Sequence, residues 1–148
     1  MTTIYKYRRV KTPGPNGATL YFRNADTEPP AVELGQIDDW WYVAVPDAAD
    51  LPEQWPEIEW QAVDVTPDLR ERLKAETRPL QLISQRIIDK IRERYPIDEE
   101  LYLARIGVGA ATGMYTPTPE EQQELQDFAV YVEDVRTWGR ALRAELGL

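Results

Sequence analysis

Residues 118–146 read TPEEQQELQDFAVYVEDVRTWGRALRAEL, and this stretch carries the clearest helix signal in the chain. Thr118 and Glu121 form a capping box, and Pro119 stands at the first helical position, where the lost N–H is not needed. Apolar residues then recur at alternating intervals of three and four, together with one glycine: Leu125, Phe128, Val132, Val135, Gly139, Leu142 and Leu146. The spacing predicts a long final helix with a narrow, heptad-like seam, which Gly139 is expected to weaken.

Two kinds of partner are compatible with this seam, because a narrow apolar stripe suits packing against another helix. One is residues 80–94 of the same chain, where Leu80, Ile83, Ile87 and Ile91 mark one face of a second helix. The other is a second protein chain. On that reading, we expect the following residues to face a protein partner: Leu125, Phe128, Val132, Val135, Trp138 and Leu142.

Further helix signals lie between residues 66 and 113. Thr66 can cap a short helix that starts with Pro67 and ends near Glu76, and Pro79 separates it from the helix at 80–94. Residues 98–105 predict a third helical piece. The glycine-rich run that follows, residues 107–113, superficially resembles a dinucleotide-binding fingerprint, but no strand precedes it, so it is interpreted as a loop.

The front of the chain has strand signals instead. Aromatic and β-branched side chains are concentrated in five runs, which predict strands: 2–11, 18–23, 32–34, 40–45 and 58–65. The Asn16-Gly17 pair predicts a hairpin between the first two of these strands. Residues 24–30 predict a loop. The expected fold class is therefore α+β, with a small antiparallel sheet in a β-rich domain at 1–65 and a helical region at 66–148.

The charge is strongly acidic and unevenly distributed. The net charge is −9, and no Lys or Arg occurs between Asn24 and Leu69, a stretch with acids from Asp26 to Asp68. Such a surface repels phosphate, so no nucleic-acid partner is expected. The stretch can be a solvated face, or it can bind a basic partner. No apolar run approaches the length of a membrane span, so no membrane partner is expected either.

Reactive side chains are scarce, because the chain contains neither histidine nor cysteine. This excludes Ser-His-Asp and Cys-His catalysis and structural zinc sites, and no catalytic, cofactor-binding or metal-ligating residue is predicted. The remaining enzymatic option is carboxylate chemistry on a glycan, with Asp38 and Asp39 just before the aromatic strand.

Aromatic side chains are plentiful: five Trp and eight Tyr. Trp and Tyr are enriched both in cores and at interfaces. Trp55, which stands between Pro52 and Pro56, is the expected exposed anchor for a partner, unless it fixes its own loop onto the domain.

The back half resembles the tail-fibre assembly and tail-fibre-associated proteins of tailed bacteriophages. The resemblance covers residues 66–148 and is carried by Leu80-Gln-Leu-Ile-Ser-Gln-Arg-Ile-Ile-Asp-Lys-Ile-Arg-Glu-Arg-Tyr95, by Asp98-Glu-Glu-Leu-Tyr-Leu-Ala-Arg105 and by Thr118-Pro-Glu-Glu121 with Phe128-Ala-Val-Tyr-Val-Glu-Asp-Val-Arg-Thr-Trp138. The closing Trp-x-x-Tyr pattern of the assembly proteins is not matched, because Tyr131 precedes Trp138.

The resemblance implies a non-enzymatic protein made in the host bacterial cytoplasm, with other viral tail proteins as partners and homo-oligomers allowed. It leaves two roles open: a fibre or baseplate component that stays in the virion tail, and a transient assembly chaperone. A glycan-binding or glycan-cleaving module is the third hypothesis.

Overall fold

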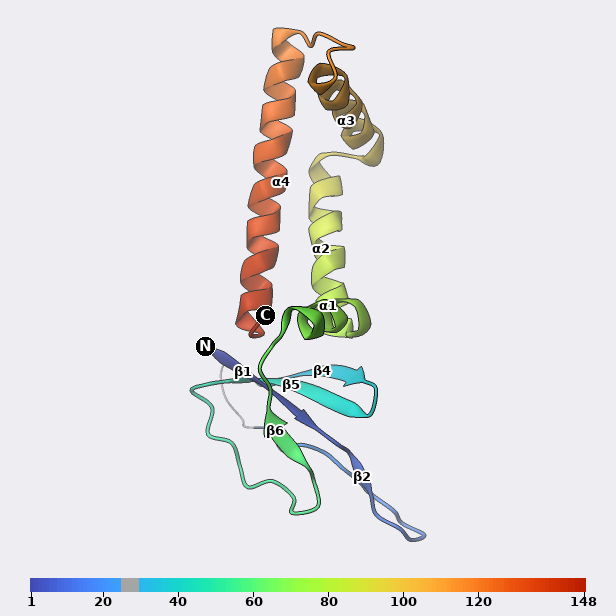
Figure 1. Cartoon of the computed structure of the whole chain (residues 1–148), viewed down its shortest axis with the longest axis vertical. Coiled ribbons are helices and arrows are strands. Elements are labelled where there is room, and N and C mark those ends of the chain that lie inside the picture. The colour runs from blue at the N-terminus through green and yellow to red at the C-terminus, as the bar shows by residue number, and fades with distance from the viewer. Residues whose placement is uncertain (25–29) are drawn as a thin grey trace. The chain divides into compact units, whose positions relative to one another are not determined.

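The computed structural model describes residues 1–24 and 30–148 and confirms the predicted α+β order, with strands first and helices after them (Figure 1). The strands are β1 (Thr2–Tyr7), β2 (Val10–Lys11), β3 (Thr19–Leu20), β4 (Val32–Ile37), β5 (Trp40–Pro46) and β6 (Trp60–Ala62). The helices are α1 (Pro67–Glu76), α2 (Arg78–Arg94), α3 (Ile97–Ala111) and α4 (Pro119–Glu145). Most of the loop predicted at 24–30 lies outside the described residues.

The described residues form two compact units. The first comprises residues 1–82 and 142–148, and the second comprises residues 83–141. The first unit therefore contains the sheet, α1 and short end segments of α2 and α4. The second contains α3 and most of α2 and α4.

The first unit is built around an antiparallel sheet with the strand order β4-β5-β1-β6. One face carries a buried cluster of Tyr7, Phe22, Val43, Val45 and Ile58, to which the strands and the loops beside them both contribute. The other face carries the directly paired and buried Ile4 and Ala44, and α1 packs beside β4. In β5 four consecutive residues, Tyr42 to Val45, are buried, so this strand is covered on both faces and does not alternate between apolar and polar residues.

The hairpin predicted around Asn16-Gly17 is present but has a longer loop than a two-residue turn. Val10 pairs with Leu20 and Lys11 with Thr19, and the Thr12 N–H donates to the Ala18 carbonyl at 2.9 Å. The strand predicted at 18–23 is shorter than expected, because Phe22 leaves the ladder and enters the buried cluster.

The second unit pairs α2 with α4, which run side by side in Figure 1. The Tyr131 hydroxyl donates to the Lys90 carbonyl at 2.9 Å, and Tyr95 packs edge-on against Phe128 with ring centroids 5.0 Å apart. Gly139 is buried, and a Cβ there would lie 2.8 Å from Ile87 Cγ1. The glycine is therefore a point where the two helices approach closely, rather than a weak place in the seam.

The loop predicted at residues 107–113 is wrong for its first part, because α3 continues to Ala111. The helix ends at Gly113, which has a φ of +71°. The Met114 N–H reaches back to the Gly109 carbonyl at 2.9 Å, and the Gly113 N–H reaches the Ala110 carbonyl at 3.2 Å. Only Gly113 is thus used as a helix terminator, in a Schellman-type ending.

Candidate protein-binding surfaces

The described residues contain no group of three or more Asp and Glu side chains arranged to hold a metal ion. Together with the absence of histidine and cysteine, this leaves the pair Asp38 and Asp39 as the only predicted site for carboxylate chemistry.

Asp38 takes part in an ion pair at the turn between β4 and β5. Its backbone has a φ of +54°, and Arg72 on α1 donates to its carboxylate from both terminal nitrogens, at 3.0 and 3.2 Å. The hydrogen bond from Arg72 lowers the pKa of Asp38 below its ordinary value. Asp38 is therefore held as a charged turn residue that ties the sheet to α1, whereas Asp39 is exposed beside Arg8 and Arg9.

The basic start of the chain is paired within the first unit. The Arg9 guanidinium lies 3.2 Å from the centre of the Trp41 ring and 4.4 Å from that of Tyr21, and it donates to both oxygens of Glu33 at 2.9 Å. The Tyr7 hydroxyl donates to the same carboxylate at 2.6 Å. Burial, followed by this hydrogen bond to Glu33, raises the pKa of Tyr7 to about 12.

Trp55, predicted as an exposed anchor, keeps 40% of its surface exposed. The Arg23 guanidinium lies 3.8 Å from the ring centre, and the Gln54 side chain next to it hydrogen-bonds both the N–H and the carbonyl of Arg23. The loop around Trp55 is therefore fixed, while the indole itself remains available to a partner.

The seam of α4 is packed against the same chain to different depths. Val135 is 2% exposed, and Gly139 is buried, so both are covered by the chain itself. Leu125, Phe128 and Val132 are half-buried; Leu142 is also half-buried and belongs to the first unit. The structure thus gives the seam its intramolecular partner and leaves the contact of its outer residues with another protein as a prediction.

Leu125, Phe128 and Val132 form one wall of an open groove of about 540 Å³ in the second unit. The other wall comes from α3, with Leu103, Ala104, Gly107, Val108 and Ala111, and Glu133 and Arg136 also line the groove. Small residues on the α3 wall and apolar ones on the α4 wall give it the character of a helix-binding surface.

Trp138 is not part of this groove and lines a different depression. It is 38% exposed, and the Lys90 ammonium lies 5.2 Å from its ring centre. Charged side chains from α2 surround it in a shallow depression of about 480 Å³: Arg86, Asp89, Lys90 and Glu93. A tryptophan within a charged rim has the composition of a binding hot spot.

One apolar row was missed from the sequence. On α3, residues Ile97, Leu101, Ala104, Val108 and Ala111 recur at intervals of four and three, and all five are exposed. Ile97 is 54% exposed, and Leu101 and Val108 are each 64% exposed. The spacing was visible in the sequence, but the loop predicted from residue 107 concealed it.

A cluster of polar contacts at the start of α4 holds α3 through Tyr102. Glu121 accepts hydrogen bonds from the Tyr102 hydroxyl at 3.0 Å, from the Tyr115 hydroxyl at 2.9 Å and from the Thr118 N–H at 2.8 Å. The backbone bond from Thr118 is the main cause that lowers the pKa of Glu121. Next to this cluster lies a pocket of about 580 Å³, whose lining includes Arg105 and Met114.

Comparison with known proteins gives no relative: no family model, curated protein or solved structure matches the chain. Within the described ranges, no helix is both long and apolar enough to cross a bilayer.

Proposed function

We propose that the chain is a non-enzymatic interaction protein of a bacteriophage tail, a fibre or baseplate component that remains in the particle. The single observation that carries the interaction role is the amount of large apolar side chain left exposed on both units, from Trp55 and Trp60 to Leu101, Val108 and Trp138. The tail assignment is supported by the resemblance of residues 66–148 described above.

Single exposed apolar residues are ordinary on a protein surface. Rows of exposed apolar residues, and aromatic residues surrounded by charged ones, mark surfaces that bind other proteins. Trp138 with its charged rim and Trp55 under Arg23 are the proposed anchors for the neighbouring tail protein. A cation lies against each indole, and such a contact reduces the side-chain entropy that is lost when a partner covers the ring.

Mass spectrometry of purified particles tests the tail assignment. We expect the protein in particles of the phage or prophage that carries the gene, at a copy number comparable with other tail proteins. Absence from purified particles would refute a structural role.

The alternative role, a transient assembly chaperone, predicts a different distribution. The protein would then occur with the fibre in the infected lysate but not in finished particles, and co-expression would increase the yield of assembled fibre. Equal assembly of the fibre without the protein would rule out this alternative.

Two variants test the proposed anchors within the same experiment. Trp138→Ala and Trp55→Ala should each reduce incorporation into particles, whereas Val130→Ala should not. Val130 is a suitable control because it is 56% exposed on the same helix as Trp138 and lies outside the depression around that residue. If both tryptophan variants are incorporated as well as the parent, Trp55 and Trp138 are not anchors, and the tail assignment is unaffected.

A further inference from the structure

α3 carries apolar residues on two different faces, and only one of them is used within the chain. Leu103 and Ile106 are 2% and 4% exposed, so they form its inner face. The outer row is Ile97, Leu101, Ala104, Val108 and Ala111, whose 4-3-4-3 spacing is that of a helix that packs along a second helix. One further helix, packed along this row, would be enough to cover it.

The geometry points to a second copy of this chain as that partner, with α3 packed antiparallel against α3. We take the outer row as the a and d positions of a heptad. An antiparallel pair then places Ile97 of one copy opposite Val108 of the other, and Leu101 opposite Ala104. The same contacts recur on the other side of the two-fold axis, so the surface is complementary to itself.

The sizes of the side chains fit this register. In the inner layers the large Leu101 meets the small Ala104, and in the outer layers Ile97 meets Val108. Ala104 and Gly107 line the groove beside the row and allow the two helices to approach closely. On the α4 wall, Leu125 and Phe128 extend the apolar surface that the second helix would cover.

The charges beside the row give an independent argument. Asp98 and Arg105 are seven residues apart on one flank of the row, and among residues 1–24 and 30–148 neither forms an ion pair. Both side chains therefore remain available to opposite charges on a partner. In the antiparallel register, Asp98 of each copy lies beside Arg105 of the other, which gives two reciprocal ion pairs.

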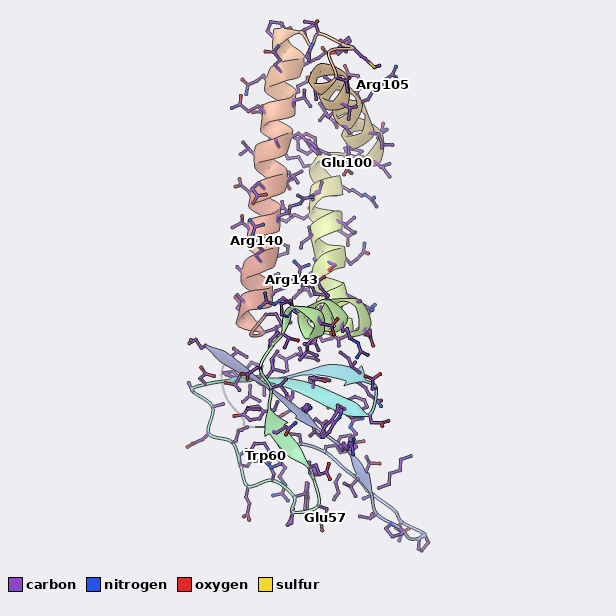
Figure 2. The ribbon with its side chains drawn as sticks, in the orientation of Figure 1. Glu57, Trp60, Glu100, Arg105, Arg140 and Arg143 are labelled. Carbon is purple, nitrogen blue, oxygen red and sulfur yellow. The ribbon has the colours of Figure 1, made fainter. Side chains whose placement is uncertain are left out.

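Figure 2 shows Arg105 on the side of α3 that faces away from α4, where a second copy can reach it. The pairing uses the second unit alone and does not involve Trp55 or Trp138. It rests on the proposed function only in treating the exposed apolar row as a protein-binding surface.

The test is the molar mass of the purified protein by sedimentation equilibrium, in the absence of other phage proteins. For a contact of this limited size we expect a dimer with a dissociation constant of roughly 10 µM. Val108→Asp should weaken the dimer by more than about tenfold, because it places a carboxylate against Ile97 of the other copy in an apolar layer of the contact. Val130→Asp, which introduces the same charge at an exposed site on α4, should leave it unchanged.

A charge-reversal cycle makes the test specific for this register. Asp98→Arg alone and Arg105→Asp alone each place like charges together and should weaken the dimer by about tenfold or more. The double variant restores opposite charges and should recover the dimer to within about threefold of the parent. Asp134→Arg is the control, because it reverses a charge on α4, outside the proposed contact, and should leave the dissociation constant unchanged. Circular dichroism confirms that each variant retains its helices.

The inference is overturned if the parent is monomeric at about 100 µM, roughly ten times the expected dissociation constant. It is also overturned if the single reversals leave the dimer intact or if the double reversal does not restore it. If the protein is monomeric but is found in phage particles, the proposed dimer is refuted and the tail assignment stands. If the protein dimerises but is absent from particles, the tail assignment is refuted and the proposed dimer stands.

Discussion

Replacement of Val135 by Asp should destabilise the second unit far more than the same replacement at Val130. Val135 is 2% exposed and Val130 is 56% exposed, and both lie on α4, so the change in helix propensity is the same. Val135 lies between Tyr131, which bonds Lys90, and Gly139, which meets Ile87. The difference between the two variants therefore reports the burial of residue 135 against α2.

The magnitude follows from two contributions. Exposing the apolar surface of one fully buried valine costs about 1.5–3 kcal/mol. An unsatisfied buried polar group adds about 1–3 kcal/mol. Together they give an expected loss of about 2.5–6 kcal/mol for Val135→Asp, against a change within about 0.5 kcal/mol for Val130→Asp.

Urea unfolding followed by helical circular dichroism measures both free energies, at low protein concentration so that association does not contribute. A loss of about 3 kcal/mol is a large part of the stability of an ordinary domain, so the midpoint of Val135→Asp should move clearly to lower urea. If the two variants unfold at the same urea concentration, Val135 is not buried against α2 and the intramolecular seam is wrong.

Three further predictions concern single positions in both units. Gly139→Val should lower the free energy of unfolding by about 1–3 kcal/mol, because the added Cβ overlaps the side chain of Ile87 where the two helices approach closely; an unchanged urea midpoint would contradict that approach. Tyr7 has its pKa raised to about 12 from 10.0, so the folded state retains a proton that the unfolded state releases, and stability is present below pH 10 and lost as the pH rises toward 12. Urea titrations across this range should show a steeper loss for the parent than for Tyr7→Phe, and equal slopes would count against the buried hydroxyl. Glu121 has its pKa lowered from 4.5, so it stabilises the fold above that pH and ceases to do so as the pH falls through its folded pKa; Glu121→Gln should reduce the loss of helicity on acidification, and a carboxyl titration by NMR with a midpoint at or above 4.5 would show that the cap with Thr118 is not formed.

Local signals were sufficient for the helix starts. Thr66 accepts from the Leu69 N–H at 3.2 Å, and Thr118 and Glu121 form the reciprocal bonds of the predicted capping box. These bonds join residues three apart, so residue type and spacing alone specify them. The same holds for Pro67 and Pro119, each of which begins its helix as expected.

Glycine could not be interpreted in this way. Gly107, Gly109 and Gly113 look alike in the sequence, but only Gly113 ends the helix. A Cβ on Gly109 would lie 2.8 Å from the Tyr115 Cβ, so this glycine is needed where the next loop folds back onto the helix. That reason depends on a contact in space, and a local pattern does not contain it.

The predicted site residues show the same difference between local signals and contacts in space. The sequence identified Trp55, Leu125, Phe128, Val132, Val135, Trp138 and Leu142 as apolar or aromatic residues with a packing role, since periodicity and residue type are properties of a short segment. It could not tell which of them the chain itself would cover. The ion pair between Asp38 and Arg72, 34 residues apart, was equally outside its reach.

The sequence by itself determined the order of strands and helices, the helix caps and the lack of imidazole and thiol groups, because each of these is a matter of residue identity and near neighbours. The tertiary structure decided that α2 covers the deepest part of the α4 seam, that Gly139 allows the close contact, and that the outer row of α3 stays exposed. These outcomes depend on which distant apolar faces meet when the chain folds, and the burial of one face determines which other face remains for a partner.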